Sequence, residues 1–182
     1  ESLGDLSESS VGLLIALPSV PATVLAFVVP WMTERLTKTV VIVIGAMLYG
    51  LGLLSFGLPH VIALDWRSGT AAQWTLQLSA LLIVGIGWGL CWTPVLPTMM
   101  EAGAHRLTSR GLERVAATRA VSAGISALFN GAAALGEASG PSLGGFALKY
   151  FGFVPVVRAV GVSFLTLALA LLCTRKKRSS SP

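Results

Sequence analysis

The residue of this sequence best suited to chemistry is Glu137, a carboxylate inside an apolar stretch. A charged side chain within a bilayer is costly, so such groups face a protein interior or a water-filled cavity and mark ion or substrate pathways. At about 100° per residue, Glu137 shares a helix face with Asn130 and nearly with Ser126. We interpret the three as a polar stripe facing a cavity, where Glu137 binds a cation or exchanges a proton for one. The alternative is a protonated, hydrogen-bonded carboxyl group with a structural role.

Glycines flank this carboxylate at regular spacing. Gly136, Gly140 and Gly144 are four residues apart and therefore stack on one face of a helix. Small residues at this spacing allow another helix to approach closely. The contact is either permanent packing or one that slides as the protein changes conformation. Pro141 is expected to bend the helix just beyond Glu137.

Composition places these residues in a membrane. The chain of 182 residues is 54% hydrophobic and only 12% charged, with a mean hydropathy of +0.78, whereas soluble domains are about 25% charged. The net charge of +5 comes from basic residues at the ends of apolar runs, which indicates membrane topology and not nucleic-acid binding. No phosphate-binding loop, metal-ligand spacing or catalytic triad occurs, so we expect no enzyme, cofactor or metal.

The apolar runs predict an all-α integral membrane protein with five spans, because about 20 apolar residues cross the hydrocarbon layer. These spans are 11–31, 39–58, 78–100, 120–147 and 154–173. Residues 1–174 would form the transmembrane domain, and residues 175–182 a basic, Ser-rich tail in solvent.

Basic residues predict the orientation of the spans. Ten of the thirteen Lys and Arg residues fall in the segments after the first and third spans or in the tail: Arg35, Lys38, Arg106, Arg110, Arg114, Arg119, Arg175, Lys176, Lys177 and Arg178. The positive-inside rule places these segments and the C-terminus in the cytoplasm. The N-terminal segment would then lie on the opposite side, which predicts a further span upstream.

Two motifs resemble those of the major facilitator superfamily. The antiporter signature of these transporters resembles Gly136-x3-Gly140-Pro141-x2-Gly144-Gly145, although Ala127 stands where the fuller pattern has another glycine. The segment 34–38 resembles the cytoplasmic D-R-x-G-R/K motif, with Glu34, Arg35 and Lys38 as its charged members and Thr37 in place of glycine. The resemblance implies that this segment acts as a cytoplasmic gate.

Residues 85–97, 126–130 and 144–153 are similar to the vesicular amine and polyamine transporter branch, a group of drug–proton antiporters. The resemblance implies that the five spans are helices eight to twelve of a twelve-helix fold, most of its C-terminal half. The missing N-terminal half of the same chain would be their partner. In this branch an aspartate of helix eleven takes part in transport, and Asn130 occupies that position here.

The resemblance implies secondary active transport of a small organic, cationic solute by alternating access, with proton antiport as its coupling. The protein would reside in the plasma membrane or an intracellular vesicle, with the lipid bilayer, the solute and protons as its partners. The alternative is a multi-span scaffold that does not transport, or an inactive truncated product.

Overall fold

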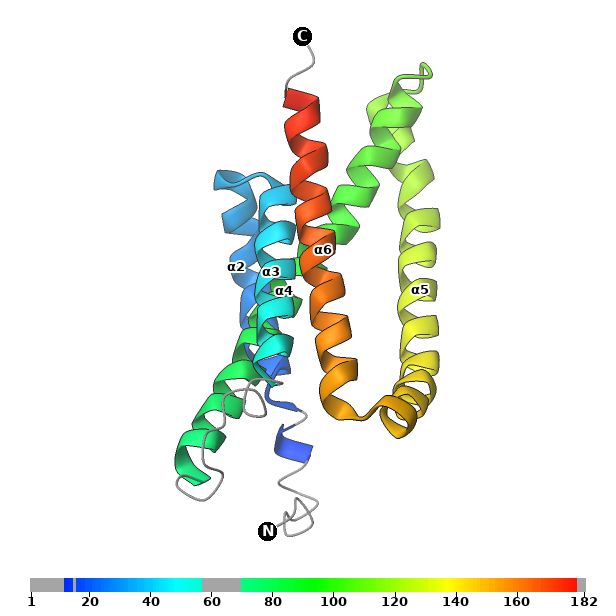
Figure 1. The fold of residues 1–182 in the computed structure, drawn as a ribbon. Helices are drawn as coiled ribbons and strands as arrows, with labels where there is room; N and C mark the ends of the chain where they lie inside the picture. The colour runs from blue at the N-terminus through cyan, green and yellow to red at the C-terminus, as the bar shows by residue number, and fades with distance from the viewer. Residues whose placement is uncertain (1–11, 15, 57–69, 180–182) are drawn as a thin grey trace.

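The computed structural model describes residues 12–14, 16–56 and 70–179, leaving out the side chains of 56, 70–74 and 175–179. This part of the chain is helical apart from short turns and contains no strand. Its long helices are α2 (Ser19–Arg35), α3 (Lys38–Phe56), α4 (Thr70–Thr108), α5 (Arg114–Phe151) and α6 (Phe153–Ser179) (Figure 1). The predicted all-α class is confirmed.

Within the described residues, four helical segments are long and apolar enough to cross a membrane. They are Gly12–Arg35, Lys38–Ser55, Thr75–Thr108 and Phe153–Thr174. They coincide with the predicted spans 11–31, 39–58, 78–100 and 154–173.

One of the five predicted spans, 120–147, does not coincide with any of these four segments. It lies within the 38-residue helix α5, which is not among the four segments with sufficient length and hydropathy. The physical reason is its composition: α5 is rich in Ala, Gly and Ser, which contribute little apolar surface, and it carries Asn130 and Glu137. The helix therefore forms as predicted, but its sequence is less apolar than that of its neighbours.

The connections between helices are shorter than the sequence patterns indicate. The polar segment 101–119 is mostly helical, and α4 turns into α5 over residues 109–113, where Gly111 takes a φ of +93°. Gly152, with a φ of +78°, links α5 directly to α6. Helix α6 continues into the predicted tail as far as Ser179. The predicted N-terminal segment 1–10 lies outside the described residues, as does most of the predicted loop 59–76.

Helices α3 and α4 pack closely against each other at glycine residues. A Cβ atom added to Gly45 of α3 would lie 2.7 Å from the backbone nitrogen of Cys91 and 2.9 Å from the carbonyl oxygen of Gly87. A Cβ atom on Gly87 would in turn meet the backbone of Tyr49, with the Tyr49 Cα 2.7 Å away. The two backbones are therefore in direct contact, as small residues permit in membrane helices.

Two further contacts of this kind complete the bundle. Gly50 of α3 and Gly161 of α6 face each other, because a Cβ atom on either would lie 2.8 or 2.9 Å from the other's carbonyl oxygen. A Cβ atom on Gly89 of α4 would be 3.0 Å from the Cα of Ala22 in α2. Helices α2, α3, α4 and α6 thus form one close-packed bundle, here called the four-helix bundle.

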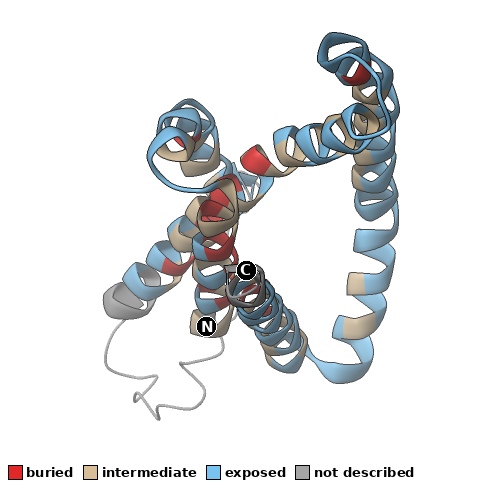
Figure 2. Ribbon diagram, turned by 90° about the horizontal axis from the view of Figure 1, so that it is seen from above, coloured by how far each residue is buried: buried red, intermediate tan, exposed pale blue. Residues whose placement is uncertain are grey.

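Few of the described side chains are buried, and apart from Ala117 of α5 they lie inside the bundle. Val29, Val41 and Leu90 form one buried cluster, and Val43, Ala46 and Ala168 form another. Large apolar side chains elsewhere point outward, Phe27 being 81% exposed. An outward apolar surface suits a lipid environment, where hydrocarbon chains are as apolar as Leu. Figure 2 shows that α5 is exposed along most of its length, and its contacts with the bundle are made mainly with α4.

Candidate functional site

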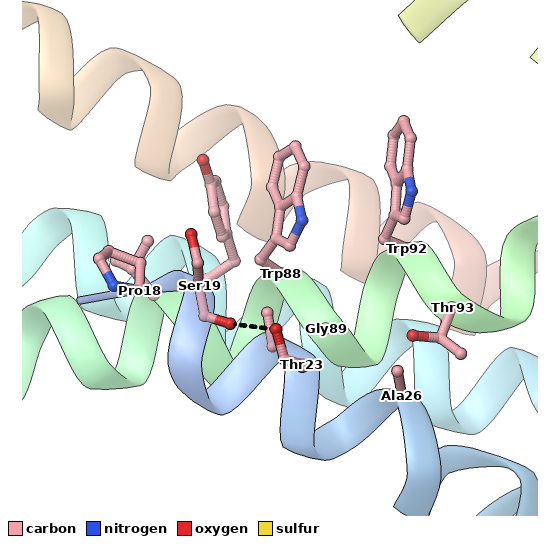
Figure 3. Close-up of a pocket in the computed structure, with 11 residues that line it drawn as sticks. Pro18, Ser19, Thr23, Ala26, Trp88, Gly89, Trp92 and Thr93 are labelled. Atoms are coloured by element: carbon pink, nitrogen blue, oxygen red, sulfur yellow. Dashed lines mark hydrogen bonds between the residues drawn. The ribbon is translucent and has the colours of Figure 1, made fainter. Parts of the chain in front are cut away.

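A cavity of about 450 Å³ opens between α2, α3 and α4. Its polar lining consists of hydroxyl side chains, and its remaining walls are aromatic, aliphatic or backbone (Figure 3). The lining residues are Pro18, Ser19, Ala22, Thr23, Ala26, Tyr49, Val84, Trp88, Gly89, Trp92 and Thr93. Among the described residues no carboxylate or basic side chain lines this space, so charge recognition would rest on the aromatic rings.

The local sequence explains why α2 begins at this cavity. Pro18 has no backbone N–H, and residues 17 and 18 form a turn before α2 starts at Ser19. The glycines of α4 let this turn come close, since a Cβ atom on Gly85 would meet the Pro18 carbonyl oxygen. Within a membrane, an interrupted helix of this kind is tolerated where it is buried in protein or lines a cavity.

Aromatic side chains form a continuous row beside the cavity. Trp88 and Trp92 are four residues apart on α4, so they project side by side (Figure 3). Their ring centroids are 5.3 Å apart and their planes differ by 12°, which is a stacked pair. Tyr49 of α3 lies 6.1 Å from Trp88, measured between ring centroids. Both tryptophans keep open faces, with 47% and 40% of their surfaces exposed.

The row extends to two more helices. The ring of Phe164 in α6 lies 4.5 Å from that of Tyr49, and the ring of Phe129 in α5 lies 4.6 Å from that of Trp92. Five rings from four helices therefore run in sequence from Phe164 to Phe129, and we call them the aromatic row. Tilted and stacked pairs at these distances are mutually attractive.

The predicted polar stripe lies on α5, the helix that contributes Phe129 to the end of this row. Ser126 is half-buried, whereas Asn130 and Glu137 are exposed. None of the three lines the cavity, although Phe129, the neighbour of Asn130, ends the aromatic row. Glu137 forms no ion pair or hydrogen bond with another described residue. Its role in a proton or cation pathway stays a prediction.

The glycine face of α5 also has no described neighbour. A Cβ atom on Gly136, Gly140, Gly144 or Gly145 would find no atom within 4 Å. Pro141 lies within the same exposed part of α5. The expected close approach of another helix is therefore not made by α2, α3, α4 or α6, and it stays a prediction.

The predicted gate residues lie at the turn between α2 and α3. Lys38 forms an ion pair with Glu101 of α4, so this turn is tied to the end of the third span. Arg35 lies 4.6 Å above the ring of Trp31, in the geometry of a cation–π contact. Glu34 is exposed at the end of α2. Lys38 thus has a partner in the structure. Glu34, Arg35 and Lys38 form no contact with one another among the described interactions.

Sequence reasoning missed the aromatic row and the partner of Lys38. The spacing of Trp88 and Trp92 was a usable signal, since residues four apart share a helix face. Glu101 also had a signal, because the third span ends on the same side of the membrane as the turn carrying Lys38. The sequence held no such signal for the contacts of Tyr49, Phe164 and Phe129, because these contacts depend on which helices pack together.

A second cavity, of about 480 Å³, lies near this ion pair between α4 and α5. Glu101, His105 and Arg114 line it together with two threonines, Met100 and Ala104, and most of its lining surface is apolar. It lies at the end of the bundle where the positive-inside rule places the cytoplasm.

No protein-family model, curated protein or solved structure matches this chain. The likeness to major facilitator transporters consequently rests on the sequence motifs alone. The cavity is known only from the geometry of this structure.

Proposed function

We propose that this chain is part of a secondary transporter of the major facilitator type. It moves a small organic, cationic solute by alternating access, in exchange for protons. In this proposal α2 to α6 correspond to helices eight to twelve of a twelve-helix fold, and an upstream part of the same chain supplies the rest. The C-terminus is cytoplasmic, and the membrane is the plasma membrane or that of an intracellular vesicle.

The observation that carries the proposal is the cavity at mid-depth of the apolar helices. Trp88 lies 13 residues from Thr75 and 20 residues from Thr108, the ends of the apolar segment of α4, or about 20 and 30 Å along the axis. Substrate sites of secondary transporters lie near the bilayer midplane, often where a helix is interrupted. The turn at Pro18 and the hydroxyl-lined, aromatic-walled space fit this description.

Glu137 supplies the coupling in this proposal. It follows Phe129 by eight residues on α5, about 12 Å along the helix axis. Asn130 lies between Phe129 and Glu137 along α5, and Ser126 lies three residues before Phe129. The stripe therefore runs along α5 past the end of the aromatic row to the carboxylate. Loss of a proton from Glu137 would leave a negative charge that attracts the cationic solute, and protonation would release it.

The ion pair between Lys38 and Glu101 acts as the cytoplasmic latch. It joins the α2–α3 turn to the end of α4, so opening of the bundle at this end must separate the two charges. Exposed pairs contribute only about 0.2–1 kcal/mol, which suits a contact that breaks in each transport cycle.

Proton-coupled uptake tests the proposal. The full-length protein is placed in proteoliposomes with an imposed pH gradient and given a panel of amines, polyamines and organic anions. We expect gradient-driven uptake of a cationic solute by the wild type and its loss in Glu137→Gln. Glu113→Gln is the matched control, because Glu113 lies at the start of the same helix, outside the predicted span, and it should leave uptake unchanged.

Two outcomes would contradict the proposal. Equal uptake by Glu137→Gln and the wild type would remove Glu137 from the coupling step. If the wild type takes up no member of the panel, the alternative of a non-transporting membrane scaffold is favoured.

A further inference from the structure

We infer that Trp88 and Trp92 bind the cationic centre of the solute through their ring faces, so that this site selects bulky, weakly hydrated organic cations over polyamines. The inference rests on the proposed function and names the solute class for the cavity. Its basis is the combination of exposed indole faces, uncommitted hydroxyl groups and the absence of a carboxylate from the described lining.

The electrostatics of the cavity favour this class. A ring face of Trp attracts a cation within about 6 Å of its centroid, and it does so most strongly where water is excluded. With no carboxylate among the described lining residues, nothing there offsets the desolvation of a small, strongly hydrated ammonium group. A cation whose charge is spread over alkyl or aryl groups loses little hydration and contacts the indole faces with its apolar surface.

The geometry of the tryptophan pair limits where the solute lies. Their centroids are 5.3 Å apart, which is less than the roughly 7 Å that a ring inserted between them would need, since stacked rings keep about 3.5 Å between planes. The outer sides of the pair are flanked by Tyr49 and Phe129. The solute must therefore lie against the parts of the two indole rings that these neighbours leave uncovered. Accessible ring surface remains, since Trp88 is 47% and Trp92 40% exposed.

Hydroxyl groups complete the site. Most Ser and Thr residues in these helices donate a hydrogen bond to a carbonyl oxygen three or four residues earlier, as Thr23 does to Ser19 at 2.8 Å. Within the described part of the chain, Ser19, Thr93 and Tyr49 form no such bond through their hydroxyl groups. All three residues line the cavity, so their hydroxyl groups are available to a polar group of the solute.

A pair of isosteric probes isolates the contribution of charge. Benzyltrimethylammonium and neopentylbenzene have the same shape and differ by one positive charge. Binding of each, and of spermidine, is measured by titration of the full-length protein in lipid nanodiscs at equilibrium. We expect the quaternary ammonium to bind at least about tenfold more tightly than the neutral probe and than spermidine. Equal binding of the charged and neutral probes, or tighter binding of spermidine, would overturn the inference without any variant.

Substitutions then locate the contact. Trp88→Leu and Trp92→Leu should each weaken benzyltrimethylammonium binding by roughly tenfold, whereas Trp92→Phe, which keeps an aromatic face, should weaken it less. Trp31→Leu is the matched control, because Trp31 lies at the other end of α2 against Arg35 and should bind like the wild type. Wild-type affinity in the folded Trp88→Leu and Trp92→Leu proteins would overturn the assignment.

The two proposals fail separately. Intact binding of the quaternary ammonium without gradient-driven uptake of any solute would reject transport and keep the aromatic site. Gradient-driven uptake that is unchanged by Trp88→Leu and Trp92→Leu would keep the transporter and reject the site.

Discussion

The four-helix bundle and α5 use the same small residue in opposite ways. In the bundle, Gly45, Gly50 and Gly87 bring backbones together so closely that an added Cβ atom would strike a neighbouring helix. In α5, the glycines from Gly124 to Gly145 have open space where their side chains would be. Glycine spacing therefore identifies a helix face that another helix can approach closely. Whether the contact forms depends on which helices pack against that face.

The same difference in glycine packing distinguishes the tightly packed bundle from the more loosely attached α5. Bundle glycines hold their helices through direct backbone contact, which tolerates no added volume. Helix α5 is attached at its ends, by the short turns to α4 and α6, and near its start by contacts such as Ile125 against Gly103 and Phe129 against Trp92. In the proposed transporter the bundle would serve as scaffold and α5 as the helix whose free face meets the rest of the protein.

The strongest test compares a glycine from each region. Gly87→Ala adds a Cβ atom against the backbone of Tyr49, and such overpacking costs about 1–3 kcal/mol of stability. Gly140→Ala adds the same atom where nothing lies within 4 Å, so its effect should stay within about 0.5 kcal/mol. Thermal unfolding in detergent measures both. A similar loss of stability in the two variants would show that the regions are packed alike.

Added volume on α5 should affect transport more than the stability of the bundle. Gly140→Leu fills the open glycine face, and if an upstream helix packs there the same overpacking applies. We expect gradient-driven uptake to fall by about tenfold with the unfolding temperature of the bundle unchanged. Wild-type uptake by this variant would show that no helix uses the face during transport.

The ring contact between the two regions is the next largest effect. Phe129→Ala removes the contact with Trp92, whose centroid is 4.6 Å away, and such pairs contribute about 0.5–1.5 kcal/mol beyond their buried area. Hydrogen exchange should speed up in α5 around residue 129 and stay unchanged in α3. Leu128→Ala is the control, because Leu128 is 70% exposed. Equal exchange in both variants would mean that the ring contact does not hold α5.

The smallest effect is expected at the ion pair. Lys38→Glu or Glu101→Lys alone should lower stability by about 0.2–1 kcal/mol, and the double exchange should restore most of it. The effect should weaken as salt rises, because Glu101 is exposed over 68% of its side chain and salt screens such pairs. A double variant no more stable than either single variant would show that the two charges do not interact.

Much of the fold could be predicted because apolar run length is a local property. Four of the five predicted spans match helices with the length and hydropathy of spans. The fifth was correct as a helix and overstated as a span, because Ala and Gly count as small residues for packing but add little hydrophobic area. The short turn at 109–113 was missed because basic residues favour a solvated loop and a solvated helix end equally.

The candidate site was predictable only in part. Glu137 was noticed as a charge within an apolar stretch and Lys38 as a member of the predicted cytoplasmic gate, and Lys38 has a partner in the structure. The cavity was not foreseen, because its walls come from three helices. Trp88 and Trp92 carried a spacing signal, but nothing in their spacing told which side of α4 faces Tyr49.

Sequence alone is sufficient for the helical class, the approximate spans and the positions of glycines and charges, because each follows from a window of about 20 residues. Tertiary structure decided which glycines make contact, which rings meet and where the cavity lies. The physical reason is that these contacts depend on helix pairing: Gly50 meets Gly161, and Tyr49 meets both Trp88 and Phe164. Residues more than a hundred positions apart carry no local signature of their partners.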